Sequence, residues 1–120
     1  MYFFDTYAII ERVLGNQNYR FTQDLVVVTT KHNICELHYA LLKQGYSKKT
    51  ATNVVETLAL KYVEPTTKDI LDAAQYRFKR KKRKLSYIDC VGYSIARRLK
   101  LKFLTGDEQF EREPGVKYVK

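Results

Sequence analysis

The sequence predicts an α/β fold in which helices cover both faces of a mainly parallel sheet. Two observations lead to this fold class. Short apolar runs alternate along the chain with stretches whose apolar side chains recur at helical spacing, a pattern typical of strand–helix–strand units. The run at residues 25–28 is rich in valine and lacks polar alternation, as expected of a strand buried on both faces. Strand order cannot be predicted from this pattern.

Each predicted element ends at a residue that breaks it, and most helices begin at a Ser or Thr that can cap them. The N-terminal half predicts a strand at 2–4 ended by Asp5, a helix at 8–14 ended by Gly15 and Asn16, a strand at 25–28, a helix at 31–43 ended by Gly45, and a helix at 47–59. The C-terminal half predicts a strand at 62–63 ended by Glu64 and Pro65, a helix at 67–78 capped by Thr66 or Thr67, a helix at 86–99, a strand at 103–105 ended by Gly106 and Asp107, and a strand at 116–119.

Length and composition favour one domain over residues 1–120 with a polyanion as its partner. No repeat, low-complexity tract or linker interrupts the chain, so we expect no domain boundary. The net charge of +9 points first to nucleic acid; the alternative is a charge that only keeps the protein soluble. No apolar run approaches the roughly 18 residues of a membrane helix. The N-terminus also lacks signal-peptide features, so we expect a cytoplasmic protein with no membrane partner.

Two acids follow apolar runs at the ends of predicted strands. Asp5 follows the run at residues 2–4, and Asp107 follows the run at residues 103–105. Ligands of open α/β sheets bind beyond the carboxyl ends of the strands, where strand order reverses. If the two strands are neighbours, the carboxylates converge and offer the oxygen ligands that hard divalent cations prefer. The alternative for each Asp is a helix cap or a turn residue.

Two further acids lie near helix starts. Glu36 falls in the helix at residues 31–43, and Asp89 lies three residues after Ser86. Both are surrounded by apolar residues, which is unusual for acids on a solvated face. The alternatives are a solvated helix face for Glu36 and a capping box with Ser86 for Asp89. Gly92, one turn beyond Asp89, is expected to leave open space where a ligand could sit.

Four segments with these acids resemble the acidic motifs of the PIN domain family, in the same order and at ordinary spacings. The segments are Asp5-Thr6, Ile34-Cys35-Glu36-Leu37, residues 86–96 (Ser-Tyr-Ile-Asp-Cys-Val-Gly-Tyr-Ser-Ile-Ala) and residues 103–110 (Phe-Leu-Thr-Gly-Asp-Glu-Gln-Phe). The resemblance implies a three-layer α/β/α sandwich with a mainly parallel sheet. It also implies Mg²⁺- or Mn²⁺-dependent endonucleolytic cleavage of RNA.

Small stand-alone members of this family are often the toxins of VapBC-type toxin–antitoxin pairs and commonly dimerise. The resemblance therefore implies an RNA substrate, an antitoxin partner and a homodimer. An RNA-processing nuclease that is not a toxin, and a non-catalytic RNA-binding module on the same fold, are the alternatives. Many relatives carry a further acid two residues after the last motif's Asp, where this chain has Gln109, which bears on whether a second metal ion binds.

Six residues form the predicted site. The four acids are expected to be both catalytic and metal-binding, and two threonines are expected to support them by hydrogen bonds: Asp5, Glu36, Asp89, Asp107, Thr6 and Thr105. Crowded carboxylates repel one another, and a bound cation removes that conflict. Asp5 and Asp107 are expected to bind the metal directly, whereas Glu36 either does the same or helps to deprotonate the attacking water. Capping and turn formation are the alternative for the threonines.

A run of cations stands out after the helix predicted at residues 67–78. Seven of eight residues are basic, namely Arg77, Lys79, Arg80, Lys81, Lys82, Arg83 and Lys84. Like charges at this density suit a helix end or a loop, and they are expected to contact RNA phosphates. The alternatives are a solvated helix C-terminus favoured by the helix dipole and a surface for an acidic partner protein.

Overall fold

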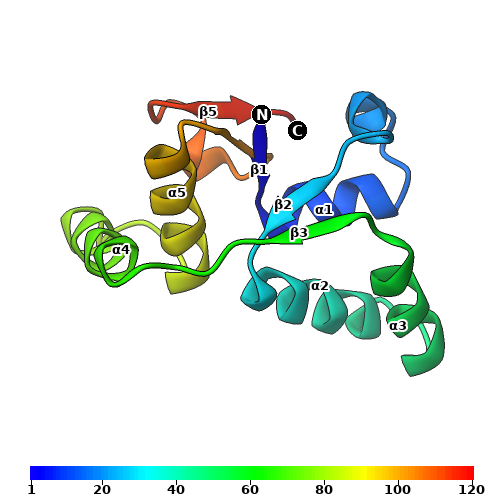
Figure 1. Ribbon diagram of the computed structural model, residues 1–120. Helices are drawn as coiled ribbons and strands as arrows, with labels where there is room; N and C mark the ends of the chain where they lie inside the picture. The colour runs from blue at the N-terminus through cyan, green and yellow to red at the C-terminus, as the bar shows by residue number, and fades with distance from the viewer.

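The computed structural model describes residues 1–120 as a sheet of five parallel strands between two layers of helices (Figure 1). The strands are β1 (Tyr2–Phe4), β2 (Val27–Thr29), β3 (Leu60–Tyr62), β4 (Lys102–Thr105) and β5 (Val116–Tyr118). The helices are α1 (Thr6–Val13), α2 (Lys31–Lys43), α3 (Lys48–Thr57), α4 (Thr67–Lys79) and α5 (Tyr87–Leu99), with 3₁₀ helices η1 (Gln17–Thr22) and η2 (Glu108–Phe110). The predicted fold class is confirmed.

The strand order β3-β2-β1-β4-β5 makes β1 the central strand. Phe3 of β1 pairs with Val28 on one side and with Phe103 on the other. The chain therefore builds the sheet outward from β1 in one direction through β2 and β3, and later in the other direction through β4 and β5. The reversal of strand order lies between β1 and β4, where open α/β sheets bind their ligands.

Two apolar cores form because successive residues of a strand point to opposite faces of the sheet. Phe3 and Phe103 pack under α4 and α5, whereas Phe4 and Leu104 pack against α1, α2 and α3. Figure 1 shows α4 and α5 on one side of β1 and the other helices on the opposite side. All four of these side chains are fully buried, as the apolar strand runs predicted.

Two local features differ from the sequence prediction. Residues 17–22 form η1, which the sequence did not indicate, because its aromatic residues show no helical period. The buried Tyr19 of η1 makes a contact distant in sequence: its hydroxyl donates to the carbonyl of Val119. Strand β3 begins at Leu60, two residues before the predicted start, because Leu60 pairs with Val27 and packs in the core of α1 to α3.

The expectation that Gly92 leaves space for a ligand is wrong. Gly92 is buried in α5 where this helix crosses the sheet, and a Cβ at this position would lie 2.8 Å from Cε1 of Phe3 and 3.3 Å from Cε1 of Phe103. The two aromatic rings thus fill the space that a side chain at Gly92 would occupy. Its role is close packing of α5 on β1 and β4, which fixes the position of the residues at the start of α5.

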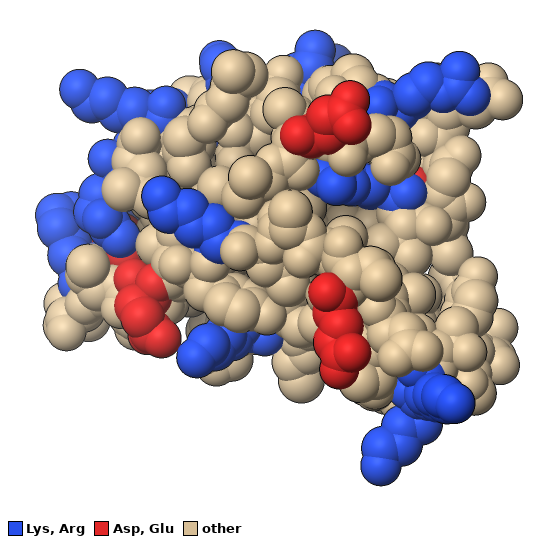
Figure 2. All heavy atoms as spheres, turned by 45° about the vertical axis from the view of Figure 1, so that its right-hand side comes forward, with Lys and Arg blue, Asp and Glu red and all other residues tan.

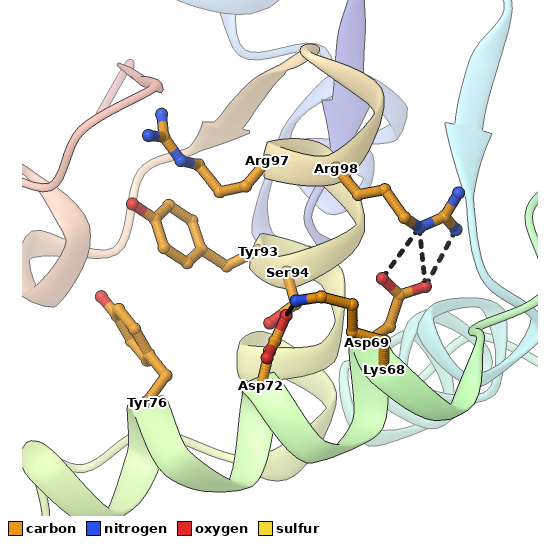
Figure 3. A pocket seen from close by; sticks show the side chains of 8 residues that line it. All are labelled: Lys68, Asp69, Asp72, Tyr76, Tyr93, Ser94, Arg97 and Arg98. Atoms are coloured by element: carbon orange, nitrogen blue, oxygen red, sulfur yellow. Dashed lines mark hydrogen bonds and ion pairs between the residues drawn. The ribbon is translucent and has the colours of Figure 1, made fainter.

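Helix α4 crosses α5 and is held there by an ion pair between the buried Asp69 and the exposed Arg98. Arg98 donates to both carboxylate oxygens of Asp69, through Nε to Oδ1 at 2.9 Å and through Nη2 to Oδ2 at 2.9 Å (Figure 3). Asp69 is 1% exposed and also accepts from the Thr66 N–H at 2.9 Å, which completes a capping box. These contacts anchor the start of α4 and lower the pKa of Asp69.

None of the helices is both long enough and apolar enough to span a membrane.

Two acids one turn apart on α4 test how much this anchor stabilises the fold. We expect Asp69→Ala to lower the free energy of unfolding by about 2–4 kcal/mol, because it removes a helix cap and leaves Arg98 without its buried partner. Asp72→Ala removes only the exposed pair with Lys68 and should cost less than about 0.5 kcal/mol. Urea denaturation of both variants measures the difference, and equal losses would contradict the anchoring role.

Candidate active site

Four carboxylates line one open cavity of about 540 Å³ at the carboxyl edge of the sheet. Asp5 follows β1 directly, Asp107 begins η2 after β4, Glu36 lies in α2 and Asp89 lies in the first turn of α5. The cavity is lined by Asp5, Thr6, Tyr7, Ile10, Cys35, Glu36, Tyr39, Ala40, Asp89 and Asp107. The four acids come from four separate segments, and the reversal of strand order brings them to one place.

Asp5 is the most buried acid of the cavity, at 3% exposure. Its Oδ2 accepts from the Thr105 hydroxyl at 2.7 Å. Its Oδ1 is buried and has no hydrogen-bond partner, the one such side-chain atom in the structure. Burial, together with the charge of Asp89, raises the pKa of Asp5 to about 8 in spite of the Thr105 hydrogen bond. An unpartnered buried carboxylate oxygen is costly, so this atom is suited to a proton or to a cation.

A chain of hydrogen bonds orients Glu36. The Thr30 hydroxyl donates to Asn33 Oδ1 at 2.6 Å, Asn33 Nδ2 donates to Thr6 Oγ1 at 2.9 Å, and Thr6 Oγ1 donates to Glu36 Oε1 at 2.6 Å. Asn33 is fully buried, and sequence reasoning missed it. The signal was available, because Asn33 lies three residues before Glu36 among apolar positions of the same helix. Burial raises the pKa of Glu36, the Thr6 hydrogen bond opposes the shift and the charge of Asp89 adds to it.

Asp89 has both of the roles considered from the sequence. Its Oδ2 accepts from the Ser86 N–H at 2.9 Å, and its own N–H donates to the Ser86 hydroxyl at 3.0 Å, which is a capping box. The same side chain also lines the cavity. Burial raises the pKa of Asp89, while the Ser86 contacts oppose the shift and the charge of Asp107 supports it. Capping uses one oxygen and leaves the second one for the cavity.

Thr105 joins Asp107 to Asp5. The Thr105 hydroxyl that donates to Asp5 also accepts from the Asp107 N–H at 3.1 Å. The carboxylate of Asp107 caps η2, since its Oδ1 accepts from the Gln109 N–H at 2.9 Å. Glu108 does not line this cavity and pairs instead with Lys120 at the C-terminus. Thr105 therefore acts on two acids at once, which is more than the turn formation considered as its alternative.

A family model of the PIN domain matches residues 2–115 of this sequence. The chain belongs to the PIN domain family. A comparison with curated protein sequences gives no significant match. The sequence motifs and the family model thus agree, and the strand order and the acid positions described above are those of this chain's PIN domain.

Three solved structures resemble this PIN domain over nearly their whole length. VapC20 from Mycobacterium tuberculosis, described as a toxin that cleaves the sarcin-ricin loop, is 15% identical with a TM-score of 0.76, and the match covers 100% of both chains. A toxin–antitoxin complex from Klebsiella pneumoniae is 16% identical with a TM-score of 0.72, covering 98% of this chain and 96% of that one.

The third structure is VapBC2 from Rickettsia felis bound to a DNA fragment from its promoter. It is 14% identical with a TM-score of 0.76, covering 99% of this chain and 98% of that one. At these identities the likeness concerns the fold. It confirms the three-layer arrangement that the sequence motifs implied.

The PIN domain carries a donor set that suits a hard divalent cation. All of its cavity acids offer carboxylate oxygens, the ligands that Mg²⁺ and Mn²⁺ take in proteins. No three of the His, Cys, Asp and Glu side chains converge on one ligand position in this structure. A cation that keeps several waters needs only one or two direct carboxylate contacts, and Asp5 Oδ1 is free to make one. The residues present therefore fit a hydrated cation.

The basic run lies next to the cavity acids, because the loop that carries it leads into α5 and contacts η2. Lys84 exchanges two backbone hydrogen bonds with the Gln109 side chain, at 2.6 and 2.9 Å. Arg77 donates through Nε to the Leu85 carbonyl at 3.0 Å and lies 4.4 Å from the ring centroid of Tyr87. Lys and Arg side chains outnumber Asp and Glu on the face shown in Figure 2, in line with the net charge of +9. The polar hollow between α4 and α5 in Figure 3 contains none of the cavity acids.

The pKa of Asp5 predicts how stability depends on pH in the absence of metal. The native state keeps a proton up to about pH 8 that the unfolded state loses near the ordinary value of 3.8. The stabilisation from this proton is complete below the unfolded value and is lost as the pH rises through 8. We expect the free energy of unfolding in EDTA to fall by on the order of 5 kcal/mol between pH 4 and 8 from this group alone.

Asp5→Asn removes the titrating group and keeps the Thr105 hydrogen bond, so it should flatten this slope. Glu56→Gln, on the exposed face of α3, should keep the wild-type slope. Chemical denaturation at a series of pH values measures both variants. An unchanged slope in Asp5→Asn would show that this carboxyl does not hold the proton.

Proposed function

We propose that this PIN domain is a metal-dependent endoribonuclease that hydrolyses RNA phosphodiester bonds, and that it is the toxin of a VapBC-type toxin–antitoxin pair. The observation that carries the proposal is the cavity at the reversal of strand order, which is lined by Asp5 with its unpartnered oxygen and by three further carboxylates. Pure RNA binding does not require such a cluster. The likeness to VapC20, described as an RNA-cleaving toxin, supports the same activity, and the cytoplasm is the location such a toxin requires.

Mg²⁺ or Mn²⁺, when bound, supplies a water of lowered pKa and neutralises charge on the leaving oxygen. Asp5 and Asp107 would hold this cation from the ends of β1 and β4. Asp89 would offer the oxygen that its capping box leaves unused. Glu36, kept in place by Thr6, orients the attacking water and accepts its proton. Its raised pKa suits a group that takes a proton during the reaction.

RNA approaches this cavity over a surface of cations and aromatic side chains. Lys79 at the end of α4 is exposed, as are Lys81, Lys82 and Lys84 in the loop beside η2. These four side chains suit contacts with phosphates. Tyr7 and Tyr39 line the cavity itself and offer rings on which an unstacked base can lie. This arrangement favours single-stranded RNA, because its unstacked bases can lie on these rings while a phosphodiester bond enters the cavity.

An antitoxin is the second partner in this proposal. The solved neighbours from Klebsiella pneumoniae and Rickettsia felis are toxin–antitoxin assemblies. An open groove of about 580 Å³ runs between α2 and α3 and shares Cys35 and Tyr39 with the cavity of the acids. A protein segment lying in this groove would reach the cavity and obstruct RNA. Because the groove and the cavity are continuous, we expect the antitoxin to inhibit RNA cleavage by occupying the cavity.

A homodimer is the expected state of the free protein. Four large apolar side chains are exposed along the outer face of α4 and at the start of α5, namely Ile70, Leu71, Phe78 and Tyr87, at 46%, 55%, 71% and 65%. An exposed apolar surface of this kind is typical of an interface. A second copy of the chain can cover it by twofold symmetry.

Substitution of Asp107 tests the chemistry. Asp107→Asn keeps the size of the side chain and the acceptor for the Gln109 N–H, but removes the charge that would hold the cation. We expect RNA cleavage with Mn²⁺ to fall by at least about 100-fold, a loss of ~2.7 kcal/mol or more in transition-state stabilisation. EDTA should abolish the wild-type activity, and Glu11→Gln, outside the cavity, should cleave normally. Wild-type cleavage by folded Asp107→Asn would contradict the proposed site.

Substitution on the outer face of α4 tests the dimer. Leu71→Arg combined with Phe78→Arg adds charge to the exposed apolar surface and touches no buried core residue. We expect the molar mass in light scattering to fall from that of two chains to that of one. Leu42→Arg, in an equally apolar but separate position of α2, serves as the control and should leave the mass unchanged. A monomeric wild-type protein would overturn the proposed homodimer.

A further inference from the structure

The cations of the basic segment (residues 77–84) fall into two groups. The arginines are engaged: Arg80 Nη2 lies 3.0 Å from Glu113 Oε1, and Arg83 Nη1 lies 3.5 Å from Glu113 Oε2. Arg77 is held by the Leu85 carbonyl and the Tyr87 ring. The four lysines make no ion pair and no side-chain hydrogen bond, and all four are exposed: Lys79, Lys81, Lys82 and Lys84. Among these four side chains, Lys81 makes a cation–π contact, with its Nζ 5.0 Å from the Phe78 ring centroid.

Glu113 is the centre of the engaged group. Its side chain is only 12% exposed, and its Oε1 accepts from the Tyr76 hydroxyl at 2.6 Å. Arg80 also stacks on Tyr76, with its Cζ 3.8 Å from the ring centroid. Burial opposes ionisation of Glu113, but the Tyr76 hydroxyl and the two arginines prevail and lower its pKa. A largely buried, ionised carboxylate therefore fixes two arginines of the segment to the loop that precedes β5.

Gln109 makes the second attachment. Its Oε1 accepts from the Lys84 N–H at 2.6 Å, and its Nε2 donates to the Lys84 carbonyl at 2.9 Å. Its main-chain carbonyl accepts from Arg83 Nη1 at 3.2 Å, and its own N–H donates to Asp107. One residue thus connects a cavity acid to the basic segment. An amide is required for the pair of bonds with Lys84, because a carboxylate cannot donate.

We propose that Gln109 and Glu113 are positioning residues that hold the basic segment beside Asp107, so that its lysines bind RNA phosphates while its arginines serve as anchors. This inference rests on the proposed ribonuclease function. Without these contacts, the like charges of the segment would repel one another, and the position of the segment beside the cavity acids would not be fixed. Fixing it in advance lowers the entropy that RNA binding must offset. This role explains why position 109 holds an amide and not an acid, since the amide makes both hydrogen bonds to Lys84.

Two matched pairs of substitutions separate the groups. Lys81→Gln with Lys82→Gln, and Arg80→Gln with Arg83→Gln, each remove two charges from the same short segment. Binding of labelled single-stranded RNA is measured by fluorescence anisotropy over a series of salt concentrations, in EDTA so that no cleavage occurs. The lysine pair should reduce the log–log salt slope by about 1.4, at about 0.7 per lost phosphate contact, and the arginine pair should reduce it by less than about 0.3.

The positioning role is tested separately by Glu113→Gln, with Glu111→Gln as a control that removes the same charge from an exposed neighbour. Glu113→Gln should raise KM for RNA about tenfold with kcat changed less than about twofold. The salt slope of RNA binding by Glu113→Gln should not fall, because Arg80 and Arg83 are released from Glu113 and keep their charges. Gln109→Glu, which loses the donor to Lys84, should behave in the same way, and Glu111→Gln should match the wild type.

The outcomes distinguish the two proposals. Equal loss of slope in the lysine and arginine pairs would mean that the arginines contact RNA themselves, which overturns the inference. An unchanged KM in folded Glu113→Gln and Gln109→Glu would also overturn it. A wild-type protein that neither binds nor cleaves RNA would instead overturn the proposed function, whereas RNA binding without salt dependence would overturn the inference about the lysines. Circular dichroism verifies folding, and if Glu113→Gln does not fold, the exposed lysine pair and the arginine pair still decide the question.

Discussion

The pairing of β1 with β4 is the constraint on which the rest of this structure depends. It aligns Phe4 with Leu104, so that Asp5 and Thr105 leave the sheet side by side and Asp107 follows one turn later. The Asp5 N–H continues the ladder by donating to the Leu104 carbonyl at 3.0 Å. Because the chain builds β2 and β3 on the other side of β1, helices from both directions begin at this edge. Every acid of the cavity owes its position to that reversal.

The fold tolerates this concentration of negative charge through hydroxyl groups and desolvation. Thr6, Thr105 and Ser86 each donate to, or share a cap with, one of the acids. These contacts stabilise the ionised carboxylates, while burial acts in the opposite direction and keeps the pKa of Asp5 high. The balance leaves one oxygen without a partner. The unpartnered Asp5 oxygen destabilises the empty site, and a bound cation would remove that cost. This is the physical basis of the proposed metal-dependent chemistry.

The positive charge of the chain is organised rather than spread evenly. The nearly buried Glu113 side chain pairs with Arg80 and Arg83. Gln109 lies in the 3₁₀ helix that Asp107 caps and hydrogen-bonds to Lys84 of the basic segment. If the cavity acids and the basic segment were both mobile, the lysines and arginines would pair with these acids and neutralise them. Attachment to a common rigid element keeps them adjacent but separate. The likeness to solved toxin and toxin–antitoxin structures at 14–16% identity concerns the fold alone.

The sequence by itself determined the type and order of most elements, because apolar periodicity and the caps at Thr66 and Ser86 act over a few residues. It also indicated the four acids of the cavity: Asp5 and Asp107 by their places at strand ends, and Glu36 and Asp89 by their apolar neighbours and the resemblance to PIN domain motifs. Strand order, the packing of Gly92 on Phe3, and the roles of Asn33 and Glu113 were decided only by the tertiary structure. The contacts that create them join distant residues, as the bond of Thr105 to Asp5 does across 100 positions, and no local pattern encodes such contacts.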